Sequence, residues 1–252
     1  MFPFIPILGF QIPSYGLCMT FGFAICCYGS SRRVRALGLS IDDFIILYVS
    51  VLGSAIIFGG LFYIFASYSV KELVLLVSNG NWSFLSNIGL VFYGGLFGGA
   101  TAALLIRRLL KIGVCDLEQC MIPFVPLGHA IGRVGCLLAG CCHGVPYVGR
   151  LAVHNRFYPE YMTFFPIQLI EAILNLCLFG VLLGYSPKAR RPFLLTSFYL
   201  FCYSIIRFVL EYFRGDTVRG IWGCFSTSQW ISLFLIICSI VMGIWNLKRK
   251  AE

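Results

Sequence analysis

The strongest constraint on the fold is a series of seven apolar segments, each close to the roughly 20 residues that a helix needs to cross a bilayer. Backbone polar groups find no water in lipid, so such segments are expected to be helical. Composition agrees, because 59% of the residues are hydrophobic and only 12% are charged. We therefore expect an all-α polytopic membrane protein with seven transmembrane helices around a polar cavity. The segments are Pro13–Gly29, Phe44–Ala66, Ile88–Ile106, Cys120–Gly140, Pro166–Gly184, Pro192–Glu211 and Gln229–Leu247.

The series is not interrupted by an internal repeat, a low-complexity linker or a soluble segment. Residues 1–252 are therefore expected to form one transmembrane domain. The apolar start of the chain, MFPFIPILGF, has no basic stretch before it, which argues against a cleaved signal peptide. The 12 Cys lack the spacing of a secreted disulfide framework, and we interpret most of them as small apolar residues inside helices.

The net charge of +9 reports orientation in the membrane rather than binding to nucleic acid. In a seven-helix arrangement, twelve of the 19 Lys and Arg residues fall on one side. Cytoplasmic loops are the ones enriched in these residues, so the sequence predicts an outside N-terminus and a cytoplasmic C-terminus. The residues on the predicted cytoplasmic side are Arg32, Arg33, Arg35, Arg107, Arg108, Lys111, Lys188, Arg190, Arg191, Lys248, Arg249 and Lys250.

Arg133 is the first candidate functional residue, because a charge within a membrane span is costly and usually lines a site or a pathway. It lies in HAIGRVGCLLAGCCHG, where the helical period places it on one face with His129, Cys136 and Gly140. The alternative is that Arg133 pairs with a carboxylate and only ties two helices together.

A second face, in the sixth segment, carries Tyr203, Arg207, Glu211 and Arg214. Arg207 and Glu211 can pair directly, since they are four residues apart. Two arginines that face one cavity suit a phosphate, because guanidinium groups are permanently charged, bidentate donors. For Arg214 the alternative is a side chain that reaches the lipid head groups.

Three other features are weak when taken singly. Gln168 and Glu171 share a face at the start of the fifth segment, where Glu171 is placed either to pair with an arginine or to orient a substrate. The stretch YGGLFGG, from Tyr93, is rich in the glycines that membrane helices use for close packing. Tyr15 begins the first segment, and tyrosines are common at membrane interfaces.

The cysteine-rich stretch after Arg133 raises the question of a metal site. It contains Cys136, Cys141, Cys142 and His143. Adjacent cysteines do not provide the usual spacing of zinc ligands. We therefore expect no metal ion and no cofactor.

Taken in order, these blocks resemble the prolipoprotein diacylglyceryl transferase family of bacterial membrane enzymes, over nearly the whole chain. The most specific blocks are Gly132–Gly144 and YSIIRFVLEYFR, which begins at Tyr203. The other matching stretches are Ser14–Gly16, Tyr93–Leu96, Pro166–Glu171 and FSTSQWISL from Phe225.

The resemblance implies that a diacylglyceryl group moves from phosphatidylglycerol to the lipobox cysteine thiol of a preprolipoprotein, which forms a thioether and releases glycerol phosphate. It also implies a multi-pass protein of the bacterial cytoplasmic (inner) membrane. The implied partners are the bilayer, phosphatidylglycerol and preprolipoproteins, with no nucleic acid. Catalytic roles are expected for Arg133, Arg207, Tyr93 and Glu211. Substrate binding is expected for Tyr15, Gly94, Gly95, His129, Cys136, Gly144, Gln168, Glu171, Tyr203 and Arg214.

The chain departs from the family pattern in ways that mark it as a divergent, cysteine-rich member. Tyr93 stands where the family usually has His, and Phe165 begins the block that usually starts with His. Cys136, Ala139 and Cys141 stand where the family usually has Asn, Asn and Glu. These differences bear on the acceptor and on the base that takes the thiol proton.

Three residues are candidates for that base: Tyr93, His129 and Glu211. Two alternative functions also remain open. One is a paralogue that moves a lipid group to another acceptor. The other is a non-catalytic lipid-binding or transport protein, although a transporter would more often contain internal repeats.

Overall fold

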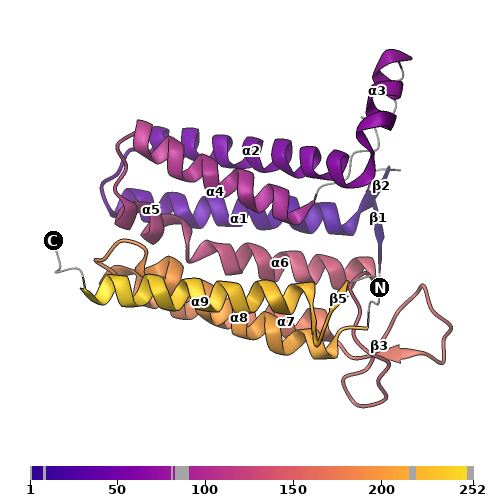
Figure 1. The fold of residues 1–252 in the computed structure, drawn as a ribbon. Helices are drawn as coiled ribbons and strands as arrows, with labels where there is room; N and C mark the ends of the chain where they lie inside the picture. Colours follow the sequence, from indigo (N-terminus) through magenta and orange to yellow (C-terminus); the bar gives the residue numbers. More distant parts are fainter. Residues whose placement is uncertain (1, 8–9, 81, 83–90, 216–219, 249–252) are drawn as a thin grey trace. The chain divides into compact units, whose positions relative to one another are not determined.

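A computed structural model describes residues 2–7, 10–80, 82, 91–215 and 220–248, and this part of the chain is mostly helical (Figure 1). Within it, five helical stretches are long and apolar enough to cross a membrane. The chain is therefore a polytopic, multi-pass membrane protein. These stretches are Ile41–Ser67, Val114–Ala139, Ile167–Lys188, Leu194–Phe213 and Thr227–Asn246.

Each of the seven predicted segments contains helix. Most of the described boundaries lie within about three residues of those expected, but α1 continues to Ala36 instead of ending at Gly29, and the helix of the fourth segment begins at Val114 instead of Cys120. The part of the third segment before residue 91 lies outside the described residues. The helices are α1 (Ser14–Ala36), α2 (Ile41–Ser67), α4 (Phe92–Leu109), α5 (Val114–Met121), α6 (Phe124–Ala139), α7 (Ile167–Tyr185), α8 (Leu194–Leu210) and α9 (Thr227–Lys248).

Two details separate these helices from the expected set. The fourth segment is divided into α5 and α6 at Pro123, because proline lacks an amide hydrogen and disfavours helix in the residue before it. Helices α1 and α4 are not among the five long apolar stretches. Polar and small residues such as Ser, Thr, Gly and Tyr lower the hydropathy of both helices, and arginines lie near the ends of both, Arg33 and Arg35 in α1 and Arg107 and Arg108 in α4.

Several short elements were not predicted from the sequence. They include the helix α3 (Val70–Ser78), which begins with a reciprocal capping box between Ser69 and Glu72. The hydrogen bonds from the Ser69 backbone and hydroxyl hold the pKa of Glu72 below its usual value. The other elements are β1 (Phe4–Ile7), β2 (Phe10–Pro13), β3 (Val153–His154), β4 (Thr163–Phe164), β5 (Ile221–Trp222), β6 (Phe225–Ser226) and the 3-10 turns η2 (Ser186–Lys188) and η3 (Glu211–Phe213). The strands form three antiparallel pairs, β1–β2, β3–β4 and β5–β6.

The chain divides into two compact units, one formed by Met1–Arg33 with Val114–Glu252 and the other by Val34–Gly113. In the larger unit, α6 packs on α7, α7 on α8 and α8 on α9 (Figure 1). Leu182 and Leu195 are fully buried in its core. Ile173 on α7 and Ile237 on α9 are more than half exposed, as apolar side chains that face lipid would be.

Glycines bring the start of α1 close to α6 within the larger unit. A Cβ atom on Gly135 would lie 2.9 Å from the Cβ of Cys18, and one on Gly29 would lie 2.3 Å from the ring of Phe124. Cys26 also donates to the backbone carbonyl of Phe124 at 3.2 Å. Small residues at such positions let two membrane helices approach closely.

The smaller unit is built on α2 and α4, which pack along each other through a second set of glycines. Cβ atoms on Gly94 and Gly98 would lie 2.5 Å from the carbonyl oxygen of Phe58 and 2.6 Å from that of Ser54, respectively. The Ser54 hydroxyl also donates to the carbonyl of Gly98 at 3.0 Å. The glycine-rich stretch therefore serves helix packing in this unit.

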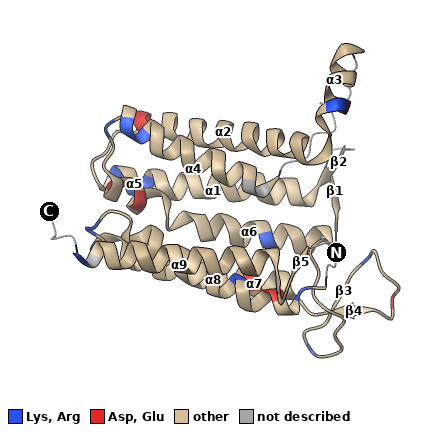
Figure 2. Ribbon diagram, in the orientation of Figure 1, with Lys and Arg blue, Asp and Glu red and all other residues tan. Residues whose placement is uncertain are grey.

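Many of the Lys and Arg residues lie toward the ends of the helices (Figure 2). In the larger unit, Arg33 at the end of α1 donates to Ser186 after α7. Arg191, before α8, donates to the carbonyl of Asn246 near the end of α9 at 2.9 Å. Three of the predicted cytoplasmic segments thus lie at the same end of this unit.

Candidate active site

The first part of the site is an ion pair between α6 and α7. Arg133 Nη2 lies 2.9 Å from Glu171 Oε1, and only 13% and 2% of the two side chains are exposed. His129, one turn earlier on α6, places Nε2 3.7 Å from the same carboxylate oxygen. The predicted face of α6 therefore meets the predicted face of α7, and Glu171 is the carboxylate partner of Arg133.

The second part lies where α8 ends and α9 begins. Arg207 Nη2 is 2.7 Å from Glu211 Oε2, and 12% and 5% of the two side chains are exposed. Arg207 also donates to the Ser228 hydroxyl at 3.2 Å. The Ser226 hydroxyl donates to Glu211 Oε1 at 2.8 Å. The expected i, i+4 pair is present, and each of its members also bonds to a serine, Glu211 to Ser226 of β6 and Arg207 to Ser228 of α9.

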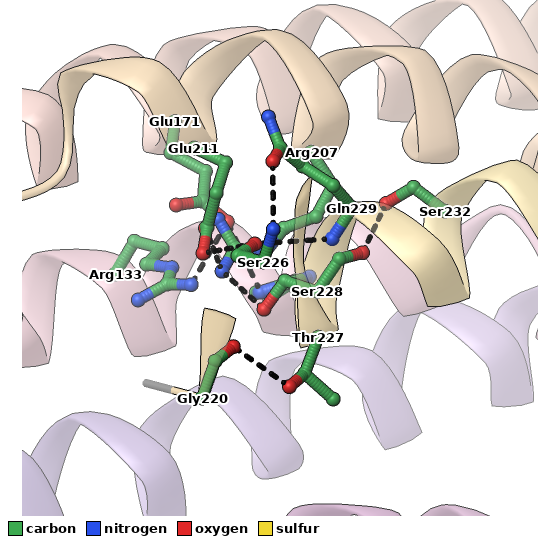
Figure 3. A network of polar contacts seen from close by, with 11 residues as sticks. Arg133, Glu171, Arg207, Glu211, Gly220, Ser226, Thr227, Ser228, Gln229 and Ser232 are labelled. Carbon is green, nitrogen blue, oxygen red and sulfur yellow. Dashed lines mark hydrogen bonds and ion pairs between the residues drawn. The ribbon is translucent and has the colours of Figure 1, made fainter. Parts of the chain in front are cut away.

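The two ion pairs belong to one polar region of the larger unit. His129 lies within electrostatic range of both Arg133 and Arg207, and its ring centroid is 5.0 Å from that of Tyr203. Figure 3 shows the arginines and their carboxylates in one network of polar contacts with the serines of β6 and α9. The positive charges of the two arginines are thus balanced by the negative charges of the two glutamates, within a largely buried region.

Each arginine retains a donor that its carboxylate does not use. Arg133 Nε and Arg207 Nη1 are buried, and within the described residues neither has a hydrogen-bond partner. A buried unsatisfied donor costs roughly 1–3 kcal/mol, and more when the group is charged. Such donors are suited to an anionic ligand that supplies the missing acceptors.

The cysteine-rich turn follows directly on the face that carries Arg133. Helix α6 ends at Ala139, and Gly140 adopts the left-handed conformation at its C-cap, with φ of 77°. The chain then turns back, so that the Sγ atoms of Cys136, Cys141 and Cys142 all lie within 4.8 Å of one another. The sequence spacing did not lead us to expect this grouping.

Two fully buried amides fix the backbone of this turn. Asn155 Nδ2 donates to the carbonyl of Gly140 at 2.8 Å. Gln168 Nε2 donates to the carbonyl of Cys141, also at 2.8 Å. Gln168 thus reaches the turn from α7, one helical turn before Glu171, and links the cysteines to the first ion pair.

Arg214 contacts the turn from the segment after α8. Hydrogen bonds from the thiols of Cys136 and Cys141, and from the guanidinium of Arg214, hold the pKa of the Cys142 thiol below its usual value. The backbones of Gly144 and Arg214 also form an antiparallel bridge. Arg214 is therefore placed at the cysteine turn.

Gly144 occupies a position with no space for a side chain. A Cβ atom there would lie 2.4 Å from the carbonyl oxygen of Phe165 and 3.0 Å from that of Phe213. The neighbouring residue, Val145, contacts both of these segments. Its amide donates to the carbonyl of Phe213 at 3.0 Å, and its carbonyl accepts from the amide of Phe165 at 2.9 Å. Gly144 thus lets three segments meet beside the site.

Tyr15 also lies with this group of residues. A Cβ atom on Gly135 would be 3.3 Å from its ring, and its hydroxyl lies within electrostatic range of Arg133 and of all three clustered cysteines. Of the predicted site residues, the larger unit brings eleven into this region: Tyr15, His129, Arg133, Cys136, Gly144, Gln168, Glu171, Tyr203, Arg207, Glu211 and Arg214.

The three remaining predicted residues belong to the smaller unit. Gly94 and Gly95 pack against α2, where a Cβ atom on Gly95 would lie 3.3 Å from the carbonyl oxygen of Ala55. Their assignment to substrate binding stays a prediction. The side chain of Tyr93 lies outside the described residues, so its catalytic role stays a prediction as well.

Sequence reasoning did not include Ser226, Ser228 or Asn155 in the site. A signal for Ser226 exists in the motif Ser-Thr-Ser-Gln. The Ser226 amide donates to Gln229 Oε1 at 3.0 Å, and the Gln229 amide donates to Ser226 Oγ at 3.2 Å. This is a capping box, which the S-x-x-Q spacing predicts at a helix start. The additional bond from Ser226 to Glu211 has no such local signal.

Comparison with known proteins identifies the family. A sequence model described as prolipoprotein diacylglyceryl transferase matches residues 3–245. A relative named phosphatidylglycerol–prolipoprotein diacylglyceryl transferase, from Clostridium tetani, is 32% identical over 251 residues, which cover 96% of each chain. A second, from Clostridium perfringens, is 30% identical and covers 98% of this chain and 96% of its own. A third, from Oceanobacillus iheyensis, is 28% identical and covers 94% and 85%. The chain belongs to the prolipoprotein diacylglyceryl transferase family.

Proposed function

We propose that the protein transfers a diacylglyceryl group from phosphatidylglycerol to the lipobox cysteine of preprolipoproteins. The full-length relatives are named for this reaction. The observation that carries the proposal is the pair of buried arginines, each with a guanidinium nitrogen that lacks a partner among the described residues. These nitrogens are donors of the kind that a phosphate ester accepts.

The chemistry of the reaction explains why such donors accelerate it. As the bond between the lipid glycerol and the phosphate breaks, the departing glycerol phosphate gains negative charge. Arginines that are already oriented stabilise that charge more strongly in the transition state than in the substrate. Glu171 and Glu211 hold Arg133 and Arg207 in place, so little reorganisation is required when the charge develops.

The other residues of the site follow from their positions. Arg133 and Arg207 bind the phosphate, and Arg214 with the cysteine turn lies beside them, where the acceptor thiol arrives. Tyr15, His129, Gln168 and Tyr203 line the surrounding region. The assigned catalytic roles of Glu211 and Tyr93 and the binding roles of Gly94, Gly95, Cys136, Gly144 and Glu171 belong to the same proposal.

The topology proposed from the sequence is consistent with this site. Seven spans in the cytoplasmic membrane of a bacterium, with an outside N-terminus, form one domain that matches the family almost from end to end. Arg207 lies in the last turn of α8, whereas Arg190 and Arg191 precede that helix. Because basic loops face the cytoplasm, Arg207 and its neighbours lie toward the outer side of the membrane.

The decisive experiment combines complementation with a reconstituted assay. The gene is expressed in a bacterium depleted of its own transferase, and the purified protein is mixed with phosphatidylglycerol vesicles and a lipobox peptide. We expect growth to be restored and the peptide to gain one diacylglyceryl group by mass spectrometry. Vesicles of phosphatidylethanolamine are the matched control. A peptide that stays unmodified, with the lipid transferred elsewhere, would indicate a different acceptor.

A further inference from the structure

The three clustered thiols are the strongest feature that the proposed reaction leaves without a role. The Sγ atoms of Cys136, Cys141 and Cys142 lie within 4.8 Å of one another, and all 12 cysteines of the chain are free. A zinc–thiolate bond is about 2.3 Å long, so sulfurs on one tetrahedral zinc ion are roughly 3.8 Å apart. The thiols therefore need to move by only about 1 Å to share a metal ion.

The protein around the turn is built to hold such a group in place. Gly140 in the left-handed conformation directs the chain back over the end of α6. Cys142 also has a positive φ of 54°, a conformation that costs energy in a residue with a side chain. The buried amides of Asn155 and Gln168 bind the carbonyls of Gly140 and Cys141. These two hydrogen bonds hold the backbone that positions the thiols of Cys141 and Cys142.

The charges around the turn also favour a thiolate–metal centre. Three thiolates on a divalent ion carry a net charge of −1, which would be costly in a largely apolar protein. Arg214 reaches Cys142, and Arg133 lies within electrostatic range of Cys136 and Cys142. These permanent positive charges offset the negative centre. Thiolate ligands select soft and borderline metals, and zinc is the common divalent choice.

We propose that Cys136, Cys141 and Cys142 bind one zinc ion, and that its open fourth position receives the thiol of the acceptor cysteine. A catalytic zinc site keeps three protein ligands and one open position. Cys141 is exposed, so the cluster can be reached from outside the protein. This inference rests on the proposed transfer to a cysteine, and it gives that reaction a means of activating the thiol without a protein base.

The step balances without an oxidant or a reductant. The acceptor thiol binds to zinc and releases its proton to water, because a thiol that coordinates a metal is deprotonated. The zinc-bound thiolate attacks the lipid glycerol carbon, a C–S bond forms, and the C–O bond to phosphate breaks. The bonding electrons leave with glycerol phosphate, which becomes a dianion beside Arg133 and Arg207. The neutral thioether is a weaker ligand and leaves the zinc.

Metal binding is tested first, with no reference to lipid transfer. The protein is purified in detergent with reductant, stripped with a chelator and titrated with Co²⁺. We expect one equivalent to produce a thiolate-to-cobalt charge-transfer band that Zn²⁺ abolishes. Cys136→Ser, Cys141→Ser and Cys142→Ser should each remove the band. Cys177→Ser, an exposed cysteine of α7 outside the cluster, should retain it.

Three results would overturn the metal site. The first is a stripped wild-type protein that gives no charge-transfer band, which does not depend on how any variant folds. The second is a disulfide among the three cysteines that persists in the active protein, shown by mass spectrometry of a digest. A band that survives in all three serine variants would also place the metal elsewhere.

The activity assay then separates this inference from the proposed function. Protein stripped of metal should lipidate the peptide on the order of 30-fold more slowly at pH 7. Without zinc, the acceptor thiol has its ordinary pKa near 8.5, and only about one thiol in 30 is then the reactive thiolate. Added Zn²⁺ should restore the rate. Full activity without metal overturns zinc activation and leaves the transferase intact. If the protein binds one zinc ion but transfers nothing from phosphatidylglycerol, the metal site is supported. The same result would overturn both the proposed reaction and the role of zinc in activating the acceptor thiol.

Discussion

Glu171 and Arg133 join α7 to α6 through an ion pair of 2.9 Å in which the carboxylate is almost completely buried. A buried pair of this kind is weak evidence for stability, because the cost of removing two charges from water offsets much of their attraction. A simple tie between the helices would leave no reason for the buried Nε of Arg133, which has no hydrogen-bond partner in the part of the chain that the structure describes. The arrangement is better explained as an arginine held in position for an anion.

Replacement of either arginine by lysine is the most direct test of the phosphate site. Lysine keeps the positive charge and loses the planar fork of donors. We expect Arg133→Lys and Arg207→Lys each to lower the transfer rate by about 100- to 1,000-fold, the usual effect of removing one donor to a developing charge. The rate is measured with the reconstituted peptide assay, and membrane insertion is checked by fractionation.

The matched control is Arg156→Lys, since Arg156 is an exposed residue in the loop between β3 and β4. It should retain the wild-type rate. If the lysine variants inserted normally and kept most of their activity, the arginines would serve as structural charges only.

Loss of the Glu171 carboxylate should destabilise the protein more than replacement of Arg133 by lysine does. Glu171→Gln leaves Arg133 buried without its counter-charge, and breaking a buried pair costs about 3–5 kcal/mol. We expect a lower thermal midpoint in detergent together with reduced activity. Glu160→Gln removes an exposed carboxylate from the loop before β4 and should change neither. A fully stable Glu171→Gln protein would show that the pair contributes little to folding.

Much of the helical framework could be predicted because the bilayer imposes it. Each segment from Pro13–Gly29 to Gln229–Leu247 contains helix, since an apolar run of that length has few other ways to satisfy its backbone in lipid. The helix α3 and the strand pairs could not be predicted in this way, because they are short segments to which the length requirement of a membrane span does not apply. The pairing of Val153 with Phe164 depends on contacts across the loop.

The site was predictable to the extent that its residues share helical faces. The i, i+4 spacing of Arg207 and Glu211 predicted their ion pair. Arg133 was identified because a charged residue within a membrane span is energetically costly and usually functional. The partnership of Arg133 with Glu171 and the meeting of three thiols required the positions of α6, α7 and the turn after Gly140 in space. The usual spacing of metal ligands along the sequence did not predict the three-thiol cluster, because Cys141 and Cys142 lie in a turn that folds back toward Cys136 on its own helix.

Gly144 provides a test of the packing beside the site. The methyl group of Gly144→Ala would lie 2.4 Å from the Phe165 carbonyl oxygen, so the bonds that join Val145 to its neighbours must give way. We expect a loss of about 1–3 kcal/mol in stability, measured by thermal unfolding. Gly180→Ala is the control, because a Cβ at this position in α7 would meet no atom within 4 Å among the described residues beyond its own helical backbone and chain neighbours. Equal stability of the two variants would contradict the close contact at Gly144.

The last test concerns Ser226, which we assign as a positioning residue for Arg207. Its hydroxyl donates to Glu211 Oε1 at 2.8 Å, while the opposite carboxylate oxygen holds Arg207. The same hydroxyl accepts from the amide of Gln229 and caps α9. Ser226→Ala should therefore lower the stability by about 1 kcal/mol, the usual value of an N-cap. It should also reduce kcat more than it raises KM, since Glu211 then orients Arg207 less firmly.

The capping and positioning roles of this hydroxyl are separable. Ser226→Thr keeps a hydroxyl that can cap the helix and donate to Glu211, and it should restore both stability and kcat. Ser226→Asp caps the helix well but places a carboxylate against Glu211 instead of a donor, so kcat should stay low even at temperatures where the protein is folded. Ser239→Ala is the control for lost hydroxyls, since it removes a buried hydroxyl that donates within α9 to the carbonyl of Ile236. If Ser226→Asp were as active as the wild type, Ser226 would be a helix cap alone, and Arg207 would be oriented by Glu211 without its help.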